Sequence, residues 1–265
     1  MAGSRNGPND GTVEGSLENT PMSVNLAPRV LTRLITGLQR AVLPTRCLLC
    51  GDPGQEDDLC AACRADLPWN APACEHCALP LPQPGSCGAC LQQPPPYARA
   101  LAVWRYAGAV AQLVPRFKFH HDLAAGRLLA ELAQARLEQW PGWQGVDQVV
   151  PMPLHAARLG QRGYNQALEL ARPWAGARRL PLPINTLRRT RATVPQTELD
   201  AAARRRNVRG AFAAAACTGA IVLLVDDVMT TGASLGEAAR ALLRAGAAEV
   251  RVLVAARAPE PGQGG

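Results

Sequence analysis

The fold of this 265-residue chain is decided by one run, Ile221-Val-Leu-Leu-Val-Asp226-Asp227-Val-Met-Thr230-Thr231-Gly232-Ala-Ser234. Its first five residues are all aliphatic, which is typical of a strand buried on both faces of a parallel sheet. Two carboxylates follow at the carboxyl end of this strand, where open α/β sheets bind ligands. A helix is expected next, over 235–244, ended by Gly246. The run therefore predicts an α/β domain with a site at this strand end.

The hydroxyl-rich segment 230–234 predicts a phosphate site. A glycine lets the backbone approach a phosphate, amides and hydroxyls donate to its oxygens, and the helix amino terminus favours negative charge. With ribose hydroxyls facing Asp226 and Asp227, the expected ligand is a sugar 5-phosphate. A simpler interpretation, an Asp helix cap and a threonine-rich turn, accounts for only one acid and one hydroxyl. The run contains neither a Walker lysine nor a GxGxxG fingerprint.

Alternating strands and helices are expected on both sides of this run, in a domain spanning 97–257 with a mostly parallel central sheet. A basic and aromatic stretch, 116–121, lies within it. Residues 258–265 are expected to form a flexible tail. The expected strands are 100–105, 146–150 and one near 184, and the expected helices are 122–139 and about 164–175.

Eight of the nine cysteines form four CxxC pairs, and each of the first four recurs 27 residues later. A CxxC turn directs two thiolates at one tetrahedral ion, and a second CxxC closes a four-sulfur shell around Zn²⁺. The segment 46–92 holds few large apolar residues, so metal binding must supply much of its folding energy. We predict a double zinc ribbon with two structural sites and these ligands: Cys47, Cys50, Cys60, Cys63, Cys74, Cys77, Cys87 and Cys90.

Two alternatives to zinc exist for the cysteines. A disulfide scaffold would need an oxidising compartment and an export signal, and neither is indicated. An iron–sulfur cluster fits the evenly duplicated spacing less well than zinc does. Duplication of a complete unit favours sequential pairing, but spacing alone also allows pairs 47/50 and 74/77 to share one metal.

The amino-terminal 45 residues give no membrane or export signal. Residues 1–26 lack an apolar segment and are expected to be a disordered tail. Apolar residues at helical spacing predict a helix within 27–45, whose apolar side packs on this protein rather than on a membrane. The longest apolar run, 211–225, is too short to cross a bilayer. We expect a cytoplasmic protein without membrane insertion.

The positive charge is concentrated in one segment. The chain carries a net charge of +7, yet 158–209 alone holds twelve arginines against three acids. Such a segment should attract a polyanion, either a phosphorylated metabolite or a nucleic acid. A solvated basic face is the plainer alternative.

The thirteen residues 222–234 resemble the signature of type I phosphoribosyltransferases. The order of motifs along the chain also resembles the ComF family, over about 30–257. These motifs are the cysteine ribbons, FKF, PMPLHxxRxxxRGYNQAxxLA, LRRTRxTxxQTxLxxxxRxxNVRGAF and LLVDDVMTTGAS. This resemblance implies a type I phosphoribosyltransferase fold that binds phosphoribosyl pyrophosphate with Mg²⁺. It also implies a link to DNA uptake during natural transformation, with single-stranded DNA and proteins of the uptake machinery as partners.

The resemblance also assigns roles to residues. Asp226 and Asp227 would bind the ribose 2- and 3-hydroxyls, and with Arg162 they are the candidate catalytic residues. A hood over 188–212 would close over the site and exclude water, although a plain Arg-rich helix over 198–208 fits the sequence equally. The hood candidates are Gln196, Arg204 and Asn207. The 5-phosphate loop would consist of Met229, Thr230, Thr231, Gly232, Ala233 and Ser234. The pyrophosphate ligands would come from Pro151, Met152, Pro153, Leu154, Arg158 and Arg162.

The chemistry implied by the resemblance is displacement of pyrophosphate from ribose carbon 1 by a nitrogen nucleophile. Purine-salvage members usually carry an acid at the position of Thr230, so purine salvage is disfavoured. The chain shows no glutaminase module either, and the acceptor stays open. The alternative is a non-catalytic module for single-stranded DNA in competence, in which the phosphoribosyl pyrophosphate site is vestigial or sensory.

Overall fold

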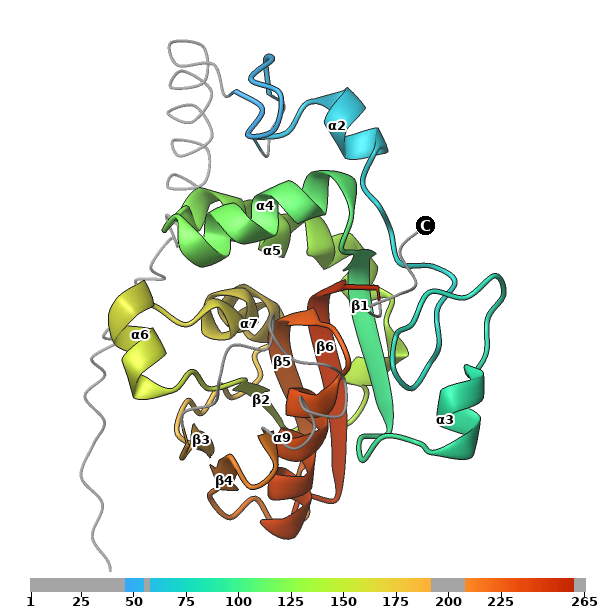
Figure 1. The fold of residues 1–265 in the computed structure, drawn as a ribbon, viewed down its shortest axis with the longest axis vertical. Helices are drawn as coiled ribbons and strands as arrows, with labels where there is room; N and C mark the ends of the chain where they lie inside the picture. The colour runs from blue at the N-terminus through green and yellow to red at the C-terminus, as the bar shows by residue number, and fades with distance from the viewer. Residues whose placement is uncertain (1–45, 55–57, 192–207, 260–265) are drawn as a thin grey trace, which may run out of the picture. The chain divides into compact units, whose positions relative to one another are not determined.

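The computed structural model describes residues 46–54, 58–191 and 208–259 (Figure 1). The expected amino-terminal tail, the helix over 27–45 and the hood candidates Gln196, Arg204 and Asn207 lie outside these residues. Within them, no helix is long and apolar enough to span a bilayer.

The centre of the fold is a four-stranded sheet in the order β1-β6-β5-β2, and all neighbouring strands run parallel. Every residue of β6 after Glu249 is buried, as expected for a parallel sheet covered on both faces. The predicted α/β fold with a parallel central sheet is thus confirmed. The strands are β1 (Arg99–Arg105), β2 (Gln148–Pro151), β5 (Ile221–Met229) and β6 (Glu249–Arg257).

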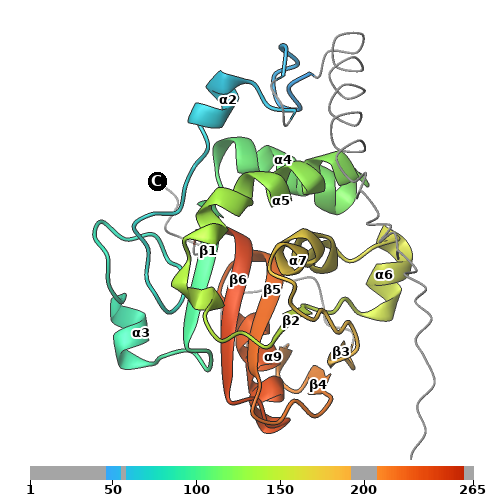
Figure 2. The same cartoon turned by 180° about the vertical axis from the view of Figure 1, so that it is seen from behind.

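Helices cover both faces of this sheet, because alternate side chains of the strands point in opposite directions. Leu223 and Val225 pack with α4 (Gly108–Phe119), α5 (Leu123–Glu138) and α7 (Gln166–Ala177). Val222 and Leu224 pack on the other face with α9 (Ala233–Arg244). Figures 1 and 2 show these two layers from opposite sides.

Short elements complete the described chain. A two-stranded antiparallel sheet lies beside α9 and is made of β3 and β4. The remaining elements are α2 (Ala61–Ala65), α3 (Gly88–Gln92), η1 (Pro141–Trp143), α6 (Ala156–Arg162), β3 (Leu187–Arg189) and β4 (Phe212–Ala214).

Among the differences between the structure and the expected elements, three concern the central sheet and α4. Strand β5 does not end before the acids, because Asp226 still pairs with Val254 in the ladder with β6. The basic and aromatic stretch 116–121 is largely helical, as the carboxyl end of α4, although Pro115 lies inside that helix. Strand β6 itself was not among the expected strands.

Candidate functional site

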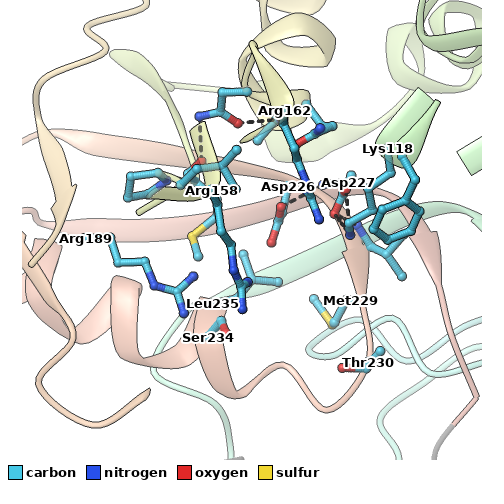
Figure 3. Close-up of a pocket in the computed structure, with 18 of the residues that line it drawn as sticks. Lys118, Arg158, Arg162, Arg189, Asp226, Asp227, Met229, Thr230, Ser234 and Leu235 are labelled. Atoms are coloured by element: carbon cyan, nitrogen blue, oxygen red, sulfur yellow. Dashed lines mark hydrogen bonds and ion pairs between the residues drawn. The ribbon is translucent and has the colours of Figure 1, made fainter. Parts of the chain in front are cut away.

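A cavity of about 620 Å³ opens where β2 and β5 end, and segments far apart in the sequence line it (Figure 3). Most of the predicted site residues meet here. The lining residues are Lys118, Phe119, His121, Met152, Pro153, Leu154, Arg158, Gln161, Arg162, Asn165, Gln166, Ala167, Arg189, Asp226, Asp227, Val228, Met229, Thr230, Gly232, Ala233, Ser234 and Leu235.

The two acids stand in different surroundings. Asp226 accepts a hydrogen bond from the Asp227 amide through Oδ1, at 2.9 Å. The buried Asp227 accepts from the Val228 amide at 2.7 Å and pairs with Lys118 Nζ, 2.8 Å from its Oδ2. Burial and the neighbouring Asp227 raise the pKa of Asp226 to about 7, while Lys118 acts in the opposite direction. At neutral pH Asp226 is therefore only partly ionised.

Lys118 is a site residue that the sequence did not identify. It lies at the carboxyl end of α4, far from the acids in the chain, and it is the only lysine of this arginine-rich sequence. The Tyr164 hydroxyl donates to the Phe117 carbonyl, and the two rings are 5.6 Å apart. This tether fixes the end of α4 beside the cavity. The signal in the sequence that could have identified Lys118 is that the chain's single lysine lies within FKF.

The 5-phosphate loop turns from β5 into α9 at Gly232. Gly232 has φ of 71° and is the residue before the helix, in the left-handed region that favours glycine. A Cβ there would lie 3.2 Å from the Tyr97 hydroxyl. The Thr231 hydroxyl accepts from the Ala233 amide at 3.4 Å, and Thr231 is not among the lining residues.

The arginines predicted for pyrophosphate lie on α6, which ends at Gly163 with φ of 71°. Arg162 donates to Gln166 Oε1 at 3.1 Å and lies over the Phe119 ring, 5.1 Å from its centroid. Both Arg158 and Arg162 line the cavity. Figure 3 shows Arg158 between the acids and a further arginine, Arg189.

Arg189 on β3 is the second site residue that the sequence did not single out. Burial lowers the pKa of Arg162 and of Arg189, and repulsion from Arg158 adds to both effects. Three guanidinium groups are therefore brought together at one side of the cavity. An anion with several oxygens would relieve their repulsion, and guanidinium forks match phosphate oxygens.

The predicted loop after β2 is positioned by a neighbouring motif. Asn165 donates to the Met152 carbonyl at 3.0 Å, and its Oδ1 caps α7 by accepting from Ala167. Met152 and Pro153 line the cavity, whereas Pro151 is the buried last residue of β2 and does not.

The two carboxylates do not form a complete Mg²⁺ site by themselves. Lys118 already pairs with Asp227, and no cluster of three potential metal ligands exists there among the residues that the structure describes. A cage built from protein ligands alone therefore does not fit. The arrangement fits Mg²⁺ only where substrate phosphates supply most of the oxygen ligands, which is a common way for proteins to hold this ion.

The cysteines form two separate Cys₄ clusters, and within each the sulfur atoms lie within 4.8 Å of one another. The pairing is sequential, 47/50/60/63 and 74/77/87/90, which resolves the choice that spacing left open. Amides support the sulfurs: Cys63 N donates to Cys60 Sγ at 3.4 Å and Cys87 N to Cys74 Sγ at 3.3 Å. Four sulfurs per ion leave no open position, so the clusters fit structural zinc.

Two family models match the chain. The double zinc ribbon domain matches residues 38–91, and the phosphoribosyl transferase domain matches residues 124–263. Distant similarity is found to solved structures of Leishmania donovani UMP synthase and of TT1426 from Thermus thermophilus. Both are 20% identical, with TM-scores of 0.30 and 0.28; they cover 51% and 53% of this chain, and 23% and 83% of their own chains.

Curated relatives match over most of the chain. DNA utilization protein YhgH of Salmonella typhimurium is 36% identical over 219 residues, which is 79% of this chain and 96% of that protein. Competence protein F of Haemophilus influenzae is 31% identical over 211 residues, covering 77% and 92% respectively. The chain therefore belongs to the ComF family, in which a double zinc ribbon precedes a phosphoribosyltransferase domain.

Proposed function

We propose that the cavity binds phosphoribosyl pyrophosphate together with Mg²⁺, and that the protein transfers the phosphoribosyl group to a nitrogen nucleophile. One observation carries this proposal: the acid pair and the loop residues 230–234 other than Thr231 share a single cavity with Arg158, Arg162 and Arg189. Its volume of about 620 Å³ lies within the usual range of small-molecule sites.

In this proposal, different residues bind the ribose, the 5-phosphate and the pyrophosphate. The acids accept hydrogen bonds from the two ribose hydroxyls, and the loop before α9 holds the 5-phosphate at a helix amino terminus. The arginines hold the pyrophosphate and stabilise the charge that develops on it as the bond to carbon 1 breaks. When bound with the pyrophosphate, Mg²⁺ supplies further neutralisation of this leaving group.

Lys118 has a part in the same proposal. Because its ammonium group lies 2.8 Å from Asp227, it compensates the charge of that carboxylate and orients it beside a second acid. Two adjacent carboxylates can then face one ribose, because the ammonium group offsets part of their mutual repulsion. Lys118 is therefore a positioning residue of the ribose site.

The test of catalysis is release of pyrophosphate. The zinc-loaded protein, incubated with phosphoribosyl pyrophosphate, Mg²⁺ and a panel of amine and base acceptors, should release pyrophosphate with one acceptor class. The matched Arg162→Met variant should release it at least tenfold more slowly, the scale of losing one charge-stabilising donor. Binding without release for any acceptor would contradict turnover and favour a sensory site.

The names of the relatives favour a second proposal, a role in DNA use or competence. We infer that arginines of the segment 158–209 that do not line the cavity contact single-stranded DNA. Affinity for a labelled oligonucleotide should then fall steeply with salt, by a log–log slope of about 0.7 per phosphate contacted. Salt-independent or undetectable binding would contradict this role.

A further inference from the structure

Arg257, the last residue of β6, joins the second zinc ribbon to the 5-phosphate loop. Its side chain is buried, with the residue 3% exposed. Nε donates to the carbonyl of the zinc ligand Cys77 at 3.1 Å. Nη1 donates to the carbonyls of Thr230, Met229 and Ala258, the Met229 contact being 3.5 Å long. One guanidinium group thus holds a zinc-binding turn and the loop at the end of β5 together.

Other contacts join the same part of the ribbon to the amino-terminal end of β1, the edge strand of the sheet. The Ala100 amide donates to the Glu75 carbonyl at 2.9 Å, and His76 Nδ1 lies 3.0 Å from the Ala98 carbonyl. Tyr97, between the ribbon and β1, is buried with its hydroxyl next to Gly232 of the loop. The second ribbon is therefore linked to the 5-phosphate loop through Arg257 and Tyr97.

The charge of the zinc site suits this arrangement. Zn²⁺ with four thiolates carries a net charge of −2, and a buried guanidinium needs a compensating negative charge nearby. The Cys77 carbonyl places Arg257 next to that cluster. A loaded zinc site would therefore stabilise Arg257 in its buried position, and an empty one would weaken this stabilisation.

Peptide geometry connects Arg257 to the phosphate. In a trans peptide the C=O of one residue and the N–H of the next point in opposite directions. Because the Thr230 carbonyl points to the Arg257 guanidinium group, the Thr231 amide points away from that group. Thr230, Gly232 and Ser234 line the cavity around this position. Fixing one carbonyl thus orients a donor for the 5-phosphate.

We propose that Arg257 is a positioning residue that fixes the 5-phosphate loop against the second zinc ribbon, so that zinc in this ribbon sets the affinity for phosphorylated ribose. This inference rests on the proposed function of the cavity. It adds a role for the ribbon: its zinc supports the ligand site as well as the ribbon's own fold.

The test compares Arg257→Met with Arg257→Lys and with a matched control, Arg251→Met. Arg251 is also a buried arginine of β6 that donates to backbone carbonyls, those of Gly142 and Gln144, but it lies about 20 Å along the strand from Arg257. Zinc content, binding of ribose 5-phosphate by calorimetry, and amide exchange in 229–236 of the free protein are measured on zinc-loaded full-length chains.

We expect Arg257→Met to keep two zinc ions, to exchange the loop amides faster, and to bind ribose 5-phosphate about tenfold or more weakly, as for the loss of an oriented phosphate contact. Arg257→Lys should recover part of the affinity, and Arg251→Met should bind like the wild type. Unchanged affinity and exchange in Arg257→Met would overturn the inference. If the wild type itself binds no ribose 5-phosphate, the proposed function fails, and amide exchange alone decides the role of Arg257.

Discussion

Asp226 and Asp227 are adjacent in the chain, yet they contribute differently to the site. Asp227 is buried and paired with Lys118, whereas Asp226 is partly exposed in the cavity and has a pKa raised to about 7. Arg162 and Arg189 also favour the ionised form of Asp226, because their guanidinium groups interact with it. Ligand hydroxyls that donate to Asp226 should therefore bind better as the pH rises through 7.

This raised pKa predicts how stability depends on pH. Between about pH 4 and pH 7 the folded chain keeps a proton on Asp226 that the unfolded chain has lost, so the wild type loses stability as the pH rises through this interval. The Asp226→Asn variant lacks this loss. Its free energy of unfolding relative to the wild type should improve from pH 5 to pH 8, by at most about 3 kcal/mol, since about two pH units of this range lie between the two pKa values and each is worth about 1.4 kcal/mol.

Thermal unfolding of both proteins at pH 5 and pH 8, in the absence of ligand, measures this difference. The Asp227→Asn variant is the control: it breaks the pair with Lys118 and should be less stable than the wild type at both pH values. Identical pH dependence of the wild type and Asp226→Asn would show that Asp226 ionises normally.

Replacing Lys118 should lower the free energy of unfolding and also change the charge of the acid pair in the ligand site. The Lys118→Met variant leaves the buried Asp227 without its ammonium partner, at an expected cost of about 1–3 kcal/mol, because the lysine is partly exposed. The pKa of Asp226 should rise further, because Lys118 lowers it in the wild type. Urea unfolding at pH 8 gives the stability change, and Lys118→Arg should restore most of it. Full stability of Lys118→Met would mean that the ion pair contributes nothing.

The sequence predicted the site residues that are contiguous and missed those that come from elsewhere. The acids and the loop after them lie in one run, so strand and loop chemistry identified them together. Lys118 and Arg189 reach the cavity from α4 and β3, and nothing in their local sequence says which strand end they face.

At the scale of elements, the hydrophobic pattern predicted helices and strands correctly where it was strong. It failed where the same pattern is compatible with both a helix and a strand. The aliphatic run of β5 and the helix α9 agree with the prediction within a few residues. The buried run of β6 could equally be helix or strand by periodicity alone. In α4 the apolar positions 110, 113, 114 and 117 have helical spacing, but Pro115 and the basic residues obscured it.

The two zinc ribbons are elements whose removal should have unequal effects. Cys90→Ser and Cys63→Ser should each reduce the zinc content from two ions to one by native mass spectrometry, because each removes one ligand of a closed site. Cys90→Ser should weaken binding of ribose 5-phosphate more strongly, because a ligand of the second ribbon, Cys77, holds Arg257, which in turn holds the loop.

Circular dichroism provides the control for this comparison, since the helices of the phosphoribosyltransferase domain should persist in both variants. Equal loss of affinity in Cys63→Ser and Cys90→Ser would contradict a specific link between the second ribbon and the loop. Loss of both zinc ions in either variant would mean that the ribbons fold as one unit.

At the scale of the whole molecule, backbone hydrogen bonds join the ribbons to the sheet in addition to side-chain contacts. The Asn70 amide donates to the Val103 carbonyl at 3.1 Å, and the Arg105 amide donates to the Pro68 carbonyl at 2.8 Å. Trp69 also pairs with Trp104, their ring centroids being 5.7 Å apart. Because every residue but proline carries the same donor and every residue the same acceptor, such docking leaves no signal in the sequence. The ribbons were predictable as modules, and their position on β1 was not.

The proposed function depends on the acid pair and the loop acting as one ribose 5-phosphate site. Calorimetry with phosphoribosyl pyrophosphate and Mg²⁺ on the wild type and on the Asp226→Asn, Asp227→Asn double variant tests this most directly. The wild type should bind one equivalent per chain, and the double variant should bind at least a hundredfold more weakly, as for the loss of two charge-assisted contacts. Equal affinity of the two folded proteins would contradict the assignment of the site.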